Sequence, residues 1–100
     1  MMNGKEVIRL IGYAGFLMNA EDTFADVVRY IVNLVNQHER ECLLRVGSLP
    51  SALSVLCKQY TWVSAQSAYL DLEAICAQFA LEWNIKDGWL IVTERDTGQH

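Results

Sequence analysis

The sequence SAQSAYLDLEAICAQFALEWNI, at positions 64–85, carries the strongest helical periodicity of the chain. Apolar residues recur every three or four positions, which is typical of one buried helix face. That face comprises Ala65, Ala68, Tyr69, Leu72, Ile75, Cys76, Phe79 and Trp83. A second apolar line of Leu70, Ala74, Ala77 and Leu81 leaves only a narrow polar edge of Gln66, Asp71, Glu73, Gln78 and Glu82. Because so wide an apolar surface needs cover on several sides, we expect this helix at the centre of the molecule.

The composition predicts one small domain with more apolar residues than it can bury. A chain of 100 residues has room for a single domain, expected to span positions 1–100 with a polar tail at 96–100. Hydrophobic residues make up 52% of the chain, whereas about 45–50% is usual even with glycine included. We therefore expect some apolar side chains to be exposed or shared with a partner.

The charges and the cysteines indicate an acidic cytoplasmic protein. The net charge of −4 disfavours binding to the phosphate backbones of nucleic acids. Cys42, Cys57 and Cys76 are widely spaced within apolar segments, so we interpret them as reduced core thiols. No uncharged run is long and apolar enough to span a membrane. Residues 5–20 faintly resemble a secretion signal, but Glu6 and Met18 do not fit that pattern.

Three further helices are expected before the central one. The first is predicted at 4–18, although residues 7–11 also alternate as a strand does. The second, at 21–41, is predicted to be capped by Asp22 or Thr23 and to bury Phe24, Val27, Val28, Ile31, Leu34, Val35, His38 and Cys42. The third is predicted to begin at Ser48 and to bury Leu49, Leu53, Leu56, Cys57 and Tyr60.

The C-terminal part of the sequence predicts a β element. Asp87 and Gly88, flanked by apolar residues, are typical of a tight hairpin turn. We expect a strand at 89–93, paired with residues 83–86 or with residues 43–46. The expected fold is mainly α, with about four helices and a short C-terminal strand or hairpin, and an α+β fold is the alternative.

No residue pattern in the sequence indicates catalysis, a cofactor or a metal. His38 and Cys42 are neighbours on the predicted second helix, but further ligands at zinc-site spacing are missing from the sequence. Gly12 and Gly15 lie in an apolar run without the lysine of a phosphate-binding loop. We therefore expect a protein that is not an enzyme.

The functional prediction rests on residues 46–70, in which Lys58 is the only charged residue. Interface centres lose charge and gain aromatic residues, so Tyr60, Trp62 and Tyr69 are the candidate partner-binding residues. The sequence favours an adaptor, regulator or inhibitor that binds another protein through a helical surface and forms a homodimer or larger homo-oligomer. The alternative is a small winged-helix-like DNA-binding regulator, although residues 64–85 contain no lysine or arginine.

Overall fold

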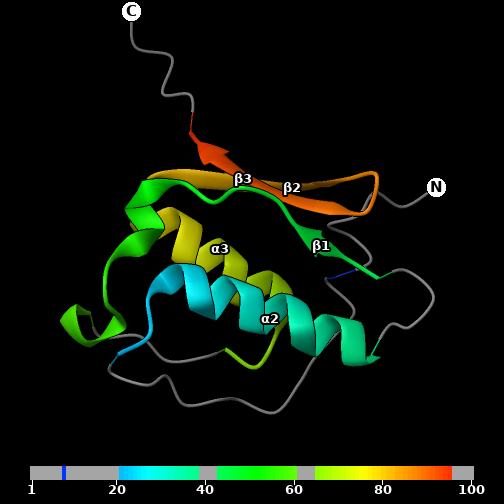
Figure 1. The fold of residues 1–100 in the computed structure, drawn as a ribbon, viewed down its shortest axis with the longest axis horizontal. Helices are drawn as coiled ribbons and strands as arrows, with labels where there is room; N and C mark the ends of the chain where they lie inside the picture. Colours follow the sequence, from blue (N-terminus) through cyan, green and yellow to red (C-terminus); the bar gives the residue numbers. More distant parts are fainter. Residues whose placement is uncertain (1–7, 9–20, 39–42, 61–64, 96–100) are drawn as a thin grey trace, which may run out of the picture.

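In the described part of the chain, two helices pack against one face of a three-stranded mixed sheet (Figure 1). The computed structural model describes residues 8, 21–38, 43–60 and 65–95. Its elements are α2 (Phe24–His38), β1 (Arg45–Val46), the 3₁₀ segments η1 (Ser51–Ser54) and η2 (Cys57–Gln59), α3 (Ala68–Gln78), β2 (Leu81–Lys86) and β3 (Trp89–Glu94). The predicted mainly α fold, a helical bundle of about four helices, is therefore wrong. The arrangement is α+β, which was the alternative.

The central strand of the sheet is β3, with the strand order β1-β3-β2. The predicted hairpin is confirmed, because β2 pairs antiparallel with β3 across a turn at Asp87 and Gly88. Both turn residues have positive φ, 54° and 83°, which is the conformation that a two-residue hairpin of type I′ requires. Residues 45–46, the other candidate partner, pair parallel with the opposite edge of β3.

Helix α2 confirms the predicted second helix, which begins at Phe24 and is described as far as His38. Thr23 and Asp26 cap its start reciprocally: the Asp26 N–H donates to the Thr23 hydroxyl at 3.2 Å, and the Thr23 N–H donates to the Asp26 carboxylate at 3.1 Å. The predicted apolar stripe is buried at Phe24, Val27, Val28, Ile31 and Val35. Cys42 lies outside the described residues, as does the side chain of His38.

The central helix is shorter than predicted, because α3 ends at Gln78 and residues 81–86 form β2. Ala80 ends it in the left-handed region, at φ 54°, a common way for a helix to stop. The predicted stripe is buried at Ala68, Leu72, Ile75 and Cys76, but Leu81 and Trp83 reach the core from the strand.

Several side-chain placements on the central segment also need correction. Asp71, assigned to the polar edge, is fully buried, and its carboxylate accepts a hydrogen bond from the Ala65 N–H at 2.6 Å. Leu70, assigned to a covered apolar line, is 53% exposed, and Ala74 and Ala77 beside it are exposed as well. The helix is thus covered on fewer sides than its composition suggested.

The predicted third helix is wrong, because its segment is split into η1 and η2 by extended residues. Val55 and Leu56 have ψ values of 150° and 138°. Their backbone pairs with the start of α2: the Phe24 N–H donates to the Val55 carbonyl at 3.2 Å, and the Cys57 N–H donates to the Asp22 carbonyl at 2.8 Å. These bonds hold the segment across the N-terminal end of α2.

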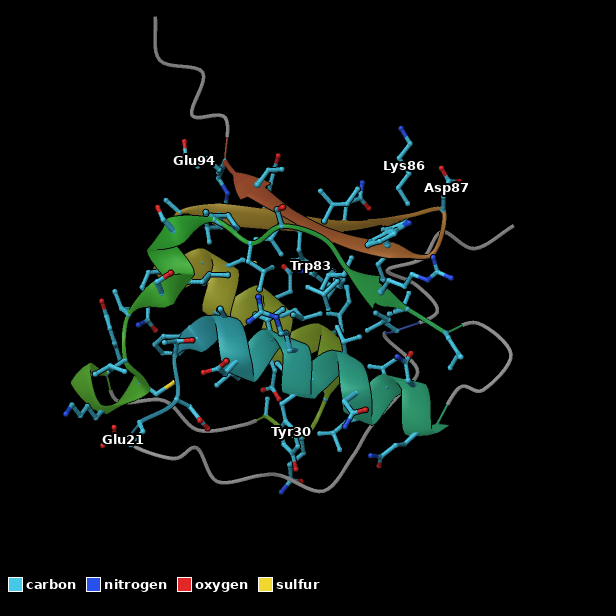
Figure 2. The ribbon with its side chains drawn as sticks, viewed as in Figure 1. Glu21, Tyr30, Trp83, Lys86, Asp87 and Glu94 are labelled. Carbon is cyan, nitrogen blue, oxygen red and sulfur yellow. The ribbon has the colours of Figure 1, made fainter. Side chains whose placement is uncertain are left out.

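The core lies between the helices and the sheet, as Trp83 illustrates in Figure 2. Its largest fully buried apolar side chains are Phe24, Ile31, Leu53, Leu72, Ile75, Leu81 and Leu90. Of the predicted helix at 4–18, the structure describes Ile8, which is helical and buried. The rest of that helix, with Gly12 and Gly15, and the tail at 96–100 lie outside the described residues.

Candidate functional site

The face of the sheet that points away from α2 and α3 is the candidate site. Side chains alternate along β2 and β3, so Trp83 and Leu90 enter the core while their neighbours are exposed. Figure 2 shows Lys86 pointing away from the helices and Trp83 lying between the sheet and the helices. We call the exposed set the outer sheet face; it consists of Arg45, Glu82, Asn84, Lys86, Trp89, Ile91 and Thr93.

The strand register arranges the outer sheet face in rows. Trp89 is paired with Arg45 on one side and with Lys86 on the other. The guanidinium carbon of Arg45 lies 5.7 Å from the centroid of the Trp89 ring, within the range of a cation–π contact. This row, next to the hairpin turn, therefore holds one aromatic ring between two cations.

The other two rows of the outer sheet face differ from the first in charge and polarity. Ile91 is paired with Asn84 in the middle row, and Thr93 is paired with Glu82 in the row farthest from the turn. Trp89 and Ile91 are 41% and 38% exposed, which is high for large apolar side chains. The face thus has a positive end, an apolar centre and a negative end at Glu82.

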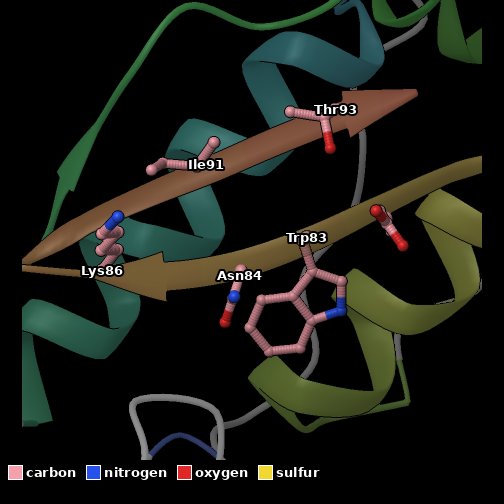
Figure 3. Close-up of a pocket in the computed structure, with 6 residues that line it drawn as sticks. Trp83, Asn84, Lys86, Ile91 and Thr93 are labelled. Atoms are coloured by element: carbon pink, nitrogen blue, oxygen red, sulfur yellow. The ribbon is translucent and has the colours of Figure 1, made fainter. Parts of the chain in front are cut away.

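A shallow hollow of about 510 Å³ lies over β2 and β3. Its lining residues, shown in Figure 3, are Glu82, Trp83, Asn84, Lys86, Ile91 and Thr93. Trp89 does not line this hollow but stands beside it, at the turn end of β3. The outer sheet face therefore has an exposed ring at one end and a hollow beside it.

Among the described strands, β2 lies at one edge of the sheet, and this edge is a weaker candidate than the outer sheet face. The Ile85 N–H donates to the side-chain oxygen of Asn84 at 2.9 Å, and the Arg95 guanidinium donates to the Leu81 carbonyl at 3.4 Å. Side chains that occupy backbone groups in this way oppose the addition of another strand. The sheet therefore offers its face more readily than its edge.

Of the three predicted binding residues, the structure describes Tyr60 and Tyr69. Tyr60 is 38% exposed, and its ring meets those of Phe24 and Phe79 edge to face at 5.3 and 5.4 Å. Tyr69 is half-buried, with its ring 5.4 Å from that of Trp83. Trp62 lies outside the described residues. The predicted Tyr60, Trp62 and Tyr69 surface stays a prediction.

The described cysteines are core thiols, as predicted. Cys57 and Cys76 are both buried in the core. Burial raises the pKa of the Cys57 thiol above its ordinary value, and the negative charges of Asp22 and Asp26 raise it further. Such a thiol stays protonated and is a poor nucleophile. Within residues 8, 21–38, 43–60 and 65–95, no group of three or more metal-binding side chains is assembled.

Trp89 and Ile91 were not among the binding residues predicted from the sequence, although strand alternation at 89–93 indicates that they share one face. The segment 89–93 was expected to be a strand, and alternation along a strand places Trp89 and Ile91 on the same face. Which face the helices would cover depends on packing between distant segments. The exposed side of the hairpin therefore could not be read from this segment alone.

Comparison with protein-family models, curated proteins and solved structures found no match for this chain. None of the helices within the described ranges has the length and apolar character needed to cross a membrane.

Proposed function

We propose that this chain is a non-catalytic protein-binding module, an adaptor, regulator or inhibitor, that binds its partner through the outer sheet face. The observation that carries the proposal is the exposure of Trp89 and Ile91 side by side on a face that α2 and α3 do not cover. Exposed aromatic and aliphatic side chains at the centre of a patch are typical binding hot spots. A polar rim, here Arg45, Lys86 and Glu82, is the usual border of such a centre.

The two buried core cysteines, Cys57 and Cys76, support action in the cytoplasm, where cysteines stay reduced. The excess of apolar residues supports a shared surface, because a domain of this size cannot bury all of them. The sheet supplies a rigid platform for binding, since both faces of the hairpin are fixed by the register of β2 and β3.

Site-specific photocrosslinking in the source cell tests this proposal. A photoreactive residue at position 91 reports what lies against the outer sheet face, and the matched control is position 70 on α3, which is apolar and more exposed. We expect protein adducts at position 91 that far exceed those at position 70. The additional substitution Trp89→Ala should abolish them, because it removes the ring next to Ile91.

Equal adducts at positions 91 and 70, or adducts at 91 that persist after Trp89→Ala, would contradict the proposal. Circular dichroism should show that Trp89→Ala leaves the secondary structure intact, since Trp89 is outside the core.

A further inference from the structure

We propose that the partner on the outer sheet face is a second copy of this chain, packed face to face with its strands reversed. This inference rests on the proposed function and adds the identity and orientation of the partner. It begins from the order of charges along β2, where Glu82, Asn84 and Lys86 follow one another on the same face.

If β2 of a second copy runs in the opposite direction over β2 of the first, the charges of the two strands lie opposite charges of the other sign. Consider a two-fold axis that lies between the two facing sheets, perpendicular to the strands, and passes over the row of Asn84 and Ile91. This axis reverses the strand direction of the second copy. It therefore places Lys86 of each copy over Glu82 of the other, giving two opposite-charge contacts by symmetry. An arrangement with the strands in the same direction would instead gather both Lys86 side chains at one end and both Glu82 side chains at the other, which repels.

The apolar centre fits the same arrangement. The axis places Ile91 of one copy against Ile91 of the other, so the two exposed side chains cover each other. It also places Trp89 of each copy over Thr93 of the other. Thr93 lines the hollow on the outer sheet face, and Trp89 of the same copy does not. Each copy thus places its exposed ring over a residue that lines the hollow of the other, as interdigitating side chains do when two sheets pack face to face.

The edge of β2 offers no equally good route to a dimer. Its Ile85 N–H and Leu81 carbonyl are already hydrogen bonded by the Asn84 and Arg95 side chains. Pairing two β2 strands would require these side chains to move away first. Face-to-face packing leaves both bonds in place.

Charge-reversed variants test the inference by sedimentation equilibrium. Lys86→Glu makes positions 82 and 86 both acidic, and Glu82→Lys makes both positions basic, so the reversed arrangement places like charges over each other in each variant and each should repel its own copy. We expect each to weaken self-association by about tenfold or more relative to the parent. Both side chains are exposed, and the circular dichroism should therefore be unchanged.

An equal mixture of the two single variants tests the orientation of the second copy. In an equal mixture, the Lys86→Glu variant has acidic side chains at positions 82 and 86, and the Glu82→Lys variant has basic side chains at both. Each acidic position then meets a basic one, so both charge contacts are restored and the mixture should associate as the parent does. The double variant Glu82→Lys/Lys86→Glu, which carries the swapped pair in one chain, should also self-associate like the parent. At high salt these differences should shrink, because the charges are screened.

A parent protein that stays monomeric at its highest soluble concentration overturns the inference, as does equal association of the parent and the single variants. A mixture or a double variant that fails to recover overturns the reversed orientation. If position 91 crosslinks to other proteins while the parent is monomeric, the proposed function stands and the second copy does not. If position 91 crosslinks to nothing, the proposed function itself has failed.

Discussion

Arg45 covers the ring of Trp89 at 5.7 Å, although the two residues belong to strands that lie far apart in the sequence. The contact exists because β1 pairs in parallel with β3 and places Arg45 directly beside Trp89. It fixes the position of a large exposed ring, and a ring held in place loses little conformational freedom when a partner covers it. The fold itself therefore holds this ring in place before a partner of the proposed kind would cover it.

Two neighbouring leucines on α3 test the orientation of that helix. Leu72 is fully buried and Leu70 is 53% exposed. Leu72→Asp places an unpaired charge in the core and should unfold the protein, whereas Leu70→Asp should change the free energy of unfolding by about 0.5 kcal/mol or less. Urea unfolding followed by circular dichroism measures both. Similar losses for the two variants would show that α3 packs by a different face.

Two alanine-to-glycine substitutions test where α3 ends. Ala80 has φ 54°, a conformation that costs a residue with a Cβ about 1–2 kcal/mol. Ala80→Gly relieves that cost and should stabilise the protein, whereas Ala74→Gly in the helix interior should destabilise it by about 1 kcal/mol. Shifts in the thermal unfolding midpoint should therefore have opposite signs. Destabilisation by both variants would indicate that the helix continues through Ala80.

Alanine substitutions at Asp71 and Gln78 test which of these two polar residues of α3 is buried. The buried Asp71 carboxylate accepts the Ala65 N–H, whereas Gln78 is exposed at the end of the helix. Asp71→Ala removes the acceptor of that N–H and should cost about 2 kcal/mol, whereas Gln78→Ala should be nearly neutral. Chemical denaturation compares them directly. Equal effects would place Asp71 back among the solvated residues.

The raised pKa of Cys57 predicts a loss of stability at alkaline pH. Below the ordinary thiol pKa both the folded and the unfolded chain hold the proton, so the contribution of the neutral buried thiol is fully present. As the pH rises, the unfolded chain loses the proton first, and the free energy of unfolding falls until the folded thiol also ionises. The loss between neutral and alkaline pH should be smaller in Cys57→Ala than in the parent. Identical losses would contradict the assignment.

Helix α2 could be predicted because its signals are local. The apolar stripe and the capping pair Thr23 and Asp26 lie within the segment itself. The end of α3 could not, because Ala80 adopts a left-handed conformation without the glycine that usually marks it. Trp83 also fitted the helical line, although it is buried from β2.

The outer sheet face was only partly predictable. Strand alternation at 89–93 and the Asp87–Gly88 turn indicated a hairpin, but the side covered by helices depended on long-range packing. The segment from Ser48 to Tyr60 misled in the same way, because the cap at Ser48 and the spacing of its apolar residues predicted a helix. Its residues Val55 and Leu56 pair with the start of α2 instead, and such pairing between distant segments leaves no periodic signal.

The reversed face-to-face packing is tested most directly by an isotope-filtered NOE spectrum of an equal mixture of labelled and unlabelled protein, which reports only contacts between copies. This packing predicts NOEs from the Trp89 indole of one copy to the Thr93 methyl of the other, and between the Ile91 methyl groups of the two copies. Intermolecular NOEs from α3 residues such as Leu70 with none from Trp89 or Ile91, or no intermolecular NOEs at all, would contradict it.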